Sequence, residues 1–393
     1  MNTTFDTIII GGGIIGLSCG YYLSRKKKRV LVLDAKGFAD GASGACDDMI
    51  LFQSKKPGIN LELSFKSLEL YKGLKDQVGD DLGFENYGGM VLIETKKELE
   101  VMEDFVRQQR SYGLEVDLID EKEMRKRQPY ISSRFIASTY CPTDSQVYPF
   151  SVMHSFEQMG KEEGMCILRH RRVIGLQKDG NGDFTVTTST GEKFVCEQVV
   201  NAAGAWAGSI AECLGECVPV VPKRGQIIIT EKIPPVGKEN LWSARYLVTK
   251  LNPEMMNDSS DEEQRSGLAF AFTRSHGNSY LIGSTREYVG FDKRTTFEGI
   301  RDIVRQAVSF VPVMKKVNFI RAMAGLRPST PDGKMILGEH DRVRNFFTVA
   351  GHEGDGIALA PITGRIVSDL LCGGKNDRAL QELSPNRFNI PGR

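Results

Sequence analysis

The chain has 393 residues, enough for two or three domains of ordinary size, which argues against a single small module. Its 51 basic and 50 acidic residues leave a net charge of +1, which excludes the global electrostatic field that would hold nucleic acid or an anionic membrane. Hydrophobic residues at 40% and charged residues at 26% are typical of a globular protein rather than a disordered or fibrous one.

The chain opens with the pattern of a β-α-β unit. Residues 7–10 form a short apolar, β-branched run, three glycines interrupt it, residues 14–24 have a helical pattern, and residues 29–33 form a second apolar run. Continuous apolar strands of this kind are typical of parallel sheets that are covered on both faces. We therefore predict a layered α/β domain at the N-terminus.

A G-x-G-x-x-G motif lies between this first strand and the helix. It consists of Gly11, Gly13 and Gly16, and Asp34 follows at the end of the second strand. The first glycine permits a tight turn, the second lets the backbone approach a pyrophosphate, and the third allows close packing of helix on strand. The helix N-terminus offers unpaired N–H groups to the phosphates. Because Asp34 can accept hydrogen bonds from a ribose diol and disfavours a 2′-phosphate, the predicted ligand is FAD or NAD rather than NADP.

The middle of the chain is richer in strands. Residues 184–188 and 193–196 flank a Ser-Thr-Gly turn and predict a β-hairpin, which residues 198–201 follow as a short buried strand. Apolar runs between residues 220 and 290 predict a second, more antiparallel domain. Within it, residues 252–267 are polar and acidic, which predicts a surface loop.

Five further stretches carry a resemblance to a known family. They are residues 40–45 (DGASGA), 199–206 (VVNAAGAW), 222–226 (PKRGQ), 324–333 (AGLRPSTPDG) and 350–357 (AGHEGDGI). With the glycine motif they make the chain resemble, over nearly its whole length, the FAD-dependent amino-acid oxidases and dehydrogenases. This family includes glycine oxidase, sarcosine oxidases, and the proline and D-hydroxyproline dehydrogenases.

The resemblance implies an α/β fold, α+β overall, in which a Rossmann-like FAD-binding domain carries an inserted substrate domain with a mixed sheet. The FAD-binding domain is expected to combine residues 1–84, 145–221 and 322–393. The substrate domain is expected to combine residues 85–144 and 222–321.

The resemblance also implies how FAD is held. Residues 321–324 lack the cysteine through which monomeric sarcosine oxidase attaches its flavin, so we expect non-covalent FAD. Residues 351–356 are expected to pass the flavin ring, where amides of a glycine-rich turn can stabilise negative charge at N1 and O2. Pro361 indicates that the regular helix after this turn begins only at that proline. The expected cofactor-binding residues are Gly11, Gly13, Ile14, Ile15, Gly16, Asp34, Ala35, Ala42, Ser43, Gly44, Val173, Ala203, Gly204, Trp206, Gly325, Arg327, Gly351, His352, Glu353, Gly354, Asp355, Gly356 and Ile357.

Two residues are expected to bind the substrate. In the glycine-oxidase branch a tyrosine and the arginine of the G-L-R-P block hold the substrate carboxylate, and the matching residues here are Tyr246 and Arg327. A guanidinium beside an apolar flavin presents paired donors to a carboxylate. The alternatives are a buried ion pair for Arg327 and a packing role in a strand for Tyr246. Hydride transfer to flavin depends mainly on placement of the substrate, so we assign no catalytic residue.

Five other polar residues near the expected flavin have roles that the sequence leaves open. We expect His352 to be packed or solvated rather than to carry a proton. Asp47, Asp48, Glu353 and Asp355 either bind the substrate ammonium or cap helices and turns.

The chain departs from glycine oxidase at two places. Glycine oxidase has Arg-Asn where this chain has residues 354–355 (GD), and small residues where it has residues 47–48 (DD). Residues 352–356 (HEGDG) and 53–58 (QSKKPG) are closer to the proline and hydroxyproline dehydrogenase branch. We therefore expect a FAD-dependent oxidoreductase that oxidises the C–N bond of a small amino or imino acid, such as D-hydroxyproline, D-proline or sarcosine. Hydride passes to flavin N5, and the imine is released or hydrolysed.

Three alternatives stay open. They are a glycine or sarcosine oxidase that uses oxygen directly, a FAD-carrying subunit of a heteromeric dehydrogenase without its own substrate site, and a NAD-dependent dehydrogenase. The electron acceptor is open and includes a partner subunit, and we expect a homo- or hetero-oligomer.

Cysteine usage and hydropathy bear on location and other ligands. The eight cysteines form no short-spaced framework, which favours reduced thiols in the cytoplasm. Cys213 and Cys217 are four residues apart, but no second Cys or His pair lies nearby in sequence, so no metal site is expected. No apolar stretch approaches the roughly 18 residues of a spanning helix, so we expect no membrane span, and the balanced charge predicts no nucleic-acid partner.

Overall fold

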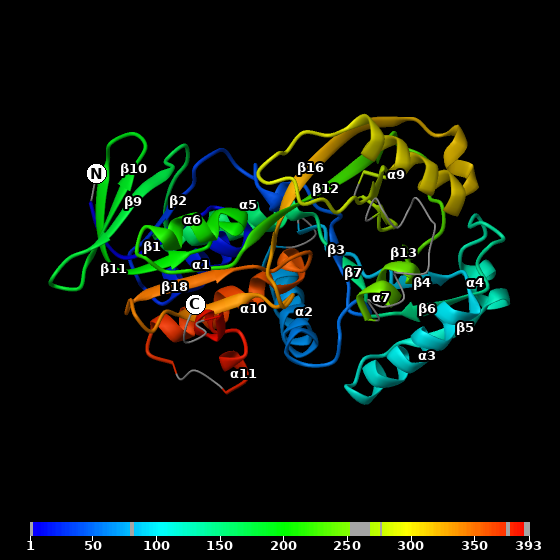
Figure 1. Cartoon of the computed structure of the whole chain (residues 1–393), viewed down its shortest axis with the longest axis horizontal. Helices are drawn as coiled ribbons and strands as arrows, with labels where there is room; N and C mark the ends of the chain where they lie inside the picture. Colours follow the sequence, from blue (N-terminus) through cyan, green and yellow to red (C-terminus); the bar gives the residue numbers. More distant parts are fainter. Residues whose placement is uncertain (1–2, 79–81, 252–267, 276, 375–377, 389–393) are drawn as a thin grey trace.

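The computed structural model describes residues 3–78, 82–251, 268–275, 277–374 and 378–388. The surface loop predicted at residues 252–267 lies outside these described residues. Figure 1 shows an elongated molecule with a large sheet toward each end, and each of these sheets has eight strands in the described part of the chain.

The first sheet contains the parallel strands predicted at the N-terminus. Its strands are β1 (Thr4–Ile10), β2 (Val30–Leu33), β8 (Cys166–Leu168), β9 (Val173–Lys178), β10 (Phe184–Thr188), β11 (Lys193–Asn201), β17 (Ile336–Glu339) and β18 (Phe346–Ala350). The order is β17-β18-β11-β1-β2-β8, with β18, β11, β1, β2 and β8 parallel. Strands β10 and β11 are antiparallel, so the predicted β-α-β unit and the predicted hairpin are both confirmed.

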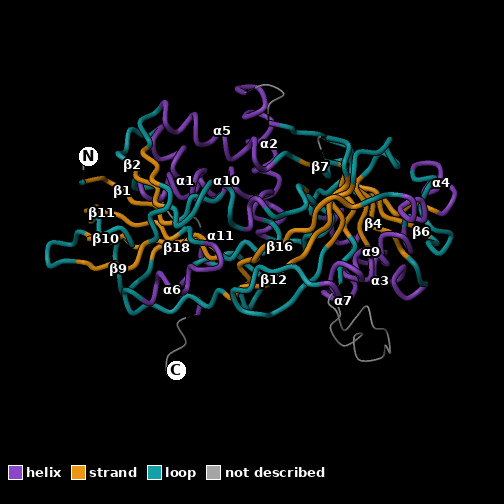
Figure 2. Tube along the Cα trace, turned by 90° about the horizontal axis from the view of Figure 1, so that it is seen from above, coloured by secondary structure: helices purple, strands orange, loops and turns teal. Residues whose placement is uncertain are grey.

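Helices cover both faces of the first sheet. They are α1 (Ile14–Arg25), α2 (Ile59–Val78), α5 (Pro149–Glu162), α6 (Ala207–Glu212) and α10 (Gly356–Leu371). Successive side chains of β1 point to opposite faces, so Ile9 packs with α1 and α10 while Ile8 and Ile10 pack with α6. Figure 2 shows α1, α2, α5 and α10 gathered on one side of the sheet. The sheet is therefore buried on both faces, as its continuous apolar strands predict.

Helix α10 begins earlier than predicted. It starts at Gly356, five residues before Pro361, which lies inside the helix. A proline has no N–H to donate to the carbonyl four residues before it, here that of Ile357. The buried Tyr71 hydroxyl donates to this carbonyl at 2.6 Å instead. The prediction that the helix starts at Pro361 was wrong because a distant side chain replaces the missing donor.

The second sheet is mostly antiparallel. Its strands are β4 (Gly89–Ile93), β5 (Asp117–Asp120), β6 (Ala137–Cys141), β12 (Val221–Thr230), β13 (Asn240–Ser243), β14 (Ala271–Arg274), β15 (Tyr280–Gly283) and β16 (Phe319–Ser329). They follow the order β16-β12-β15-β14-β13-β4-β6-β5, and only the pair of β13 and β4 is parallel in the described chain. The helices beside it are α3 (Lys96–Ser111), α4 (Glu121–Arg127), α7 (Ala244–Leu251) and α9 (Phe297–Phe310). Strands β12 to β15 form the more antiparallel region that the sequence predicts between residues 220 and 290, whereas β4, β5, β6 and β16 join the sheet from outside that region.

Tyr246 lies in a helix, α7, and not in the strand that we expected. Ala244, Leu247, Val248 and Leu251 follow the i, i+3, i+4, i+7 spacing of a helix, and they pack in one apolar cluster with α3. This spacing indicates the helix that the expectation of a strand at Tyr246 overlooked.

The remaining elements are short. They are β3 (Met49–Ile50) paired with β7 (Ser145–Gln146), α11 (Arg378–Gln381), and 3-10 turns at Ala42–Gly44, Gly204–Trp206, Pro312–Lys316 and Pro385–Phe388. Within the described residues, no helix is both long and apolar enough to cross a bilayer. We retain the predicted domain boundaries after residues 84, 144, 221 and 321 as a proposal.

Candidate active site

A continuous cavity of about 1160 Å³ is lined by residues from both large sheets. The ends of β1, β2 and β18 contribute from the first sheet, and β12, β13, β14 and β16 contribute from the second. Ordinary ligand pockets have volumes of about 300–1,000 Å³. This cavity therefore has room for a dinucleotide and a small second ligand.

Most of the predicted site residues line this cavity. Those that do are Gly11, Gly13, Ile14, Ile15, Asp34, Ala35, Ala42, Ser43, Val173, Ala203, Gly204, Trp206, Tyr246, Gly325, Arg327, His352, Glu353, Gly354, Asp355, Gly356 and Ile357. Gly16, Gly44 and Gly351 are not among the lining residues, and a Cβ on any of them would overlap a neighbouring atom. These three glycines act through close packing, which is the role predicted for Gly16.

The glycine turn after β1 fits a pyrophosphate. No side chain caps the N-terminus of α1 at Gly13, although the Ile14 amide donates to Ser43 Oγ at 3.1 Å. A Cβ on Gly13 would contact only the Ser43 hydroxyl, at 3.3 Å, so the backbone there is open to the cavity. A Cβ on Gly11 would instead overlap the Ala202 carbonyl. The turn therefore combines a packed glycine with an open one beside a helix N-terminus.

Asp34 is fixed at the end of β2 by backbone amides. One carboxylate oxygen accepts from Gly12 N at 2.6 Å, and the other accepts from Lys36 N at 2.7 Å. Because these two bonds fix the orientation of the carboxylate at the cavity wall, Asp34 is placed to accept from a ribose diol.

His352 is packed, as expected. Its Nε2 lies 3.2 Å from Thr363 Oγ1, and the residue is 4% exposed. Burial lowers the pKa of His352 to about 4, and the charge of Asp355 opposes this only partly. The imidazole is therefore neutral near pH 7.

Two of the four carboxylates that the sequence left open have protein partners. Asp355 lies 3.0 Å from the ammonium of Lys55, which is 300 residues away and whose side chain is only 2% exposed. Glu353 accepts a hydrogen bond from the Ser329 hydroxyl and lies 3.7 Å from the ammonium of Lys223. The sequence could not reveal these pairings, because each joins separate elements.

A buried polar network fixes the loop that carries Lys55. Asp144 accepts from Phe52 N at 2.6 Å and from Gln53 Nε2 at 2.5 Å. Gln109 of α3 donates to the carbonyls of Gln53 and Lys55 at 3.1 and 2.9 Å. Burial raises the pKa of Asp144 to about 6, although the Phe52 amide, Gln53 and Lys55 oppose the shift. The loop thus places the Lys55 ammonium at the N-terminus of α10.

Arg327 lies on β16, opposite Lys223 of β12. It donates to Ser284 Oγ at 2.6 Å and makes no ion pair within 4.0 Å among the described residues. A Cβ on the neighbouring Gly225 would lie 3.4 Å from the guanidinium carbon, so the glycine leaves space for it. The described residues therefore give no support to the alternative that Arg327 belongs to a buried ion pair.

Arg286 is a site residue that sequence reasoning missed. It lines the cavity, and its guanidinium carbon lies 3.3 Å from the centre of the Tyr246 ring. Burial lowers its pKa to about 10, and the charge of Arg327 adds to this effect while Tyr246 opposes it. The cavity therefore holds two guanidinium groups that repel each other and favour an anion between them.

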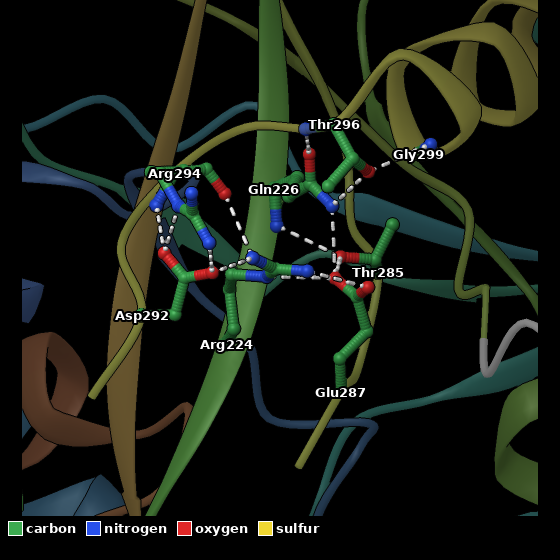
Figure 3. Close-up of polar contacts among 8 residues, drawn as sticks. All are labelled: Arg224, Gln226, Thr285, Glu287, Asp292, Arg294, Thr296 and Gly299. Atoms are coloured by element: carbon green, nitrogen blue, oxygen red, sulfur yellow. Dashed lines mark hydrogen bonds and ion pairs between the residues drawn. The ribbon is translucent and has the colours of Figure 1, made fainter. Parts of the chain in front are cut away.

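A polar network holds the segment that carries Arg286 (Figure 3). Arg224 of β12 forms a bidentate pair with Glu287, with N–O distances of 2.8 and 3.1 Å. Gln226 donates to Glu287 at 2.8 Å, and Thr285 Oγ1 lies 2.8 Å from the same carboxylate oxygen. Side chains alternate along an extended segment, so anchoring residues 285 and 287 on one side directs Arg286 into the cavity on the other. Residue type gave no signal for Arg286, because the anchors of Glu287 are Arg224 and Gln226 of a distant strand.

The adjacent carboxylates Asp47 and Asp48 differ in placement. Asp47 lines the cavity, whereas Asp48 is 8% exposed and is not a lining residue. Burial raises the pKa of both, and the neighbouring charge of Asp47 adds to the shift of Asp48, while Arg327 opposes that of Asp47. Only Asp47 of this pair faces the space where a ligand would lie.

Metal ligands and thiols were two further features that the sequence raised. No group of three or more His, Cys, Asp or Glu side chains there has the arrangement of a metal site. All eight cysteines are free thiols, and Cys213 and Cys217 are both exposed.

Comparisons with known proteins agree with this geometry. Hydrogen cyanide synthase subunit HcnC of Pseudomonas aeruginosa is 30% identical over 413 residues, which cover 94% of this chain and 93% of that protein. Glycine oxidase of Geobacillus kaustophilus is 28% identical over 380 residues and 94% of both chains, and its crystal structure superposes with a TM-score of 0.87 over 98% of this chain and 100% of that one, at 26% identity. L-proline dehydrogenase from P. horikoshii, at 24% identity, shares the fold with a TM-score of 0.87 over 99% of both chains. The sequence profile of the FAD dependent oxidoreductase family (DAO) matches residues 6–370. The chain therefore belongs to this family of FAD-dependent oxidoreductases, with FAD rather than NAD as its cofactor.

Proposed function

We propose that this enzyme oxidises the C–N bond of a small amino or imino acid, with a secondary amine such as D-hydroxyproline, D-proline or sarcosine as its substrate. Bound FAD supplies the two-electron acceptor, to which hydride passes from the carbon that bears the nitrogen. The imine that forms is released or hydrolysed. The protein's part is to hold this carbon against flavin N5.

The observation that carries the proposal is the Arg327 guanidinium in the cavity. Ser284 occupies one of its donors, and its remaining donors have no ion-pair partner in the described chain. A guanidinium in this state binds a carboxylate through two parallel hydrogen bonds. Tyr246 and Arg286 line the same cavity, so the carboxylate of an amino acid would meet three donor groups there.

We further propose that FAD is held without a covalent bond. Residue 323, beside the G-L-R-P block, is a methionine, and Cys46 of the cavity lining is half-buried. Desolvation, together with the charges of Asp48 and Asp47, raises the pKa of its thiol well above the usual range. A thiol that does not ionise is a poor nucleophile toward a flavin. Precipitation in acid should therefore leave the yellow colour in the supernatant.

A second candidate function is that of a FAD-carrying subunit in a larger dehydrogenase. The relative HcnC is a subunit of hydrogen cyanide synthase, and this favours a heteromeric assembly. The eight free cysteines support the proposal of a reducing, cytoplasmic location.

The decisive experiment is anaerobic reduction of the bound flavin by the isolated chain. Both enantiomers of proline, hydroxyproline and alanine, together with N-methylglycine, are mixed with the yellow protein, and loss of flavin absorbance is followed. We expect a secondary amine to bleach the flavin fastest. Bleaching by dithionite but by none of these amines would contradict the proposed function and favour the subunit alternative. Readmission of oxygen then distinguishes an oxidase from a dehydrogenase.

A further inference from the structure

Three of the four carboxylates near the expected flavin either have a protein partner or lie outside the cavity lining. Asp355 pairs with the buried Lys55, and Glu353 accepts from Ser329. Asp48 is buried outside the cavity lining. These placements leave one of the four facing the ligand space without such a partner.

That carboxylate belongs to Asp47. It lines the cavity and makes no hydrogen bond or ion pair with another side chain among the described residues, while the backbone amides of Asp47 and Met49 face it. The charged side chains of Arg327 and Arg286, which come from two other elements, also act on it. A small zwitterion between these groups would meet two cations at one end and an anion at the other.

The surroundings of Asp47 make it a proton acceptor. Arg327 and Arg286 favour its ionised form, whereas burial favours the neutral form and outweighs them, so its pKa is raised. The other titratable groups that face it are Asp48 and Cys46, whose own pKa values are raised well above their usual ranges. A carboxylate with a raised pKa accepts a proton more readily than an exposed one.

We propose that Asp47 binds the amine nitrogen of the substrate and takes its proton, while Arg327 and Arg286 hold the carboxylate. This inference rests on the proposed function. The substrate ammonium gives one proton to the Asp47 carboxylate and becomes a neutral amine with a lone pair. Bound FAD would then accept a hydride, and with it two electrons, from the adjacent carbon, which leaves a C=N bond in the product. The proton on Asp47 returns to solvent through the cavity.

The test compares Asp47→Asn with Asp48→Asn in the FAD-loaded enzyme. Asp48 is the matched control, because it is the neighbouring carboxylate, lies outside the cavity lining, and has a φ of 65°, which asparagine tolerates well. Two ligands are used: the fastest amine of the reduction screen, and methylthioacetate, which keeps the carboxylate but has sulfur in place of nitrogen. Binding of methylthioacetate is read from the shift of the flavin spectrum.

The expected effects of Asp47→Asn have opposite signs for the two ligands. Flavin reduction by the amine slows about 100-fold or more, as for loss of a general base. Methylthioacetate binds more tightly, because this ligand is an anion without an ammonium group and the negative charge of Asp47, which faces its sulfur, is gone. In the wild type, kcat/KM falls as pH drops through the pKa of Asp47, and Asp47→Asn loses this acidic limb while Asp48→Asn keeps it.

Two results would overturn the inference. One is an Asp47→Asn enzyme that reduces its flavin at the wild-type rate with an unchanged acidic limb. The other is equal weakening of both ligands, which indicates a merely structural role. Failure of the proposed function itself is distinguishable, because then no amine reduces the wild-type flavin.

Discussion

The buried ion pair at the start of α10 should be asymmetric in its effect on stability. Lys55 has a side chain that is 2% exposed, whereas that of Asp355 is 30% exposed. Asp355→Asn leaves a buried ammonium with neutral acceptors, the Leu51 carbonyl and the new amide oxygen, and no anion to pair with in the described chain, so we expect a loss of about 3 kcal/mol in the free energy of unfolding. Lys55→Met leaves a carboxylate that water and the N-terminus of α10 stabilise, so we expect a loss of only about 1 kcal/mol.

The assay is urea unfolding of the FAD-loaded variants in saturating FAD, followed by circular dichroism and compared at their midpoints. A matched control lies at the other end of the same helix, where Lys26 and Asp369 are 3.5 Å apart and about half exposed, at 53% and 52%. Lys26→Met and Asp369→Asn should each cost at most about 1 kcal/mol, because solvent screens such pairs. Equal losses for Asp355→Asn and Lys55→Met, or a larger loss for Lys55→Met, would refute the reasoning.

Three further substitutions test other parts of the structure. Arg327→Ala should lower kcat/KM about 100-fold, because the substrate loses a charged anchor, and Arg327→Lys should recover part of this loss. Unchanged steady-state kinetics would show that this arginine is not part of the site. Tyr71→Phe should cost about 1–3 kcal/mol in urea unfolding, because the Ile357 carbonyl loses its donor, and a neutral result would mean that water replaces the hydroxyl. Gly16→Ala should give protein without FAD, because its Cβ would overlap the Gly11 carbonyl, and a yellow variant with the wild-type ratio of flavin to protein would contradict this.

Local patterns predicted the parts of the fold whose contacts are close in sequence. The β-α-β unit and the hairpin of β10 and β11 depend on apolar runs and turns that lie side by side in the chain, and both are present. The spacing of Ala244, Leu247, Val248 and Leu251 also indicates helix α7, although we expected a strand at Tyr246. The start of α10 was not predictable locally, because Tyr71 supplies the hydrogen bond that Pro361 cannot.

The site residues that could be predicted from the sequence are likewise those whose contacts are local. The glycine motif and Asp34 were identifiable because turn, helix and acid follow one another within one unit. The pairing of Lys55 with Asp355 joins residues that are 300 positions apart, so only the folded chain reveals it. The roles of the four carboxylates stayed open for the same reason. Their different roles follow from their burial and their partners in the folded chain, and residue type alone does not distinguish them.

The most direct test of the central claim is a crystal structure of the FAD-loaded protein with pyrrole-2-carboxylate, a planar analogue of proline that cannot be oxidised at the same carbon. We expect one flavin to extend from the turn at residues 11–16 to the turn at residues 351–356, with the ligand carboxylate on the Arg327 guanidinium and its nitrogen toward Asp47. A flavin that lies outside this cavity, or a carboxylate bound away from Arg327, would contradict the account.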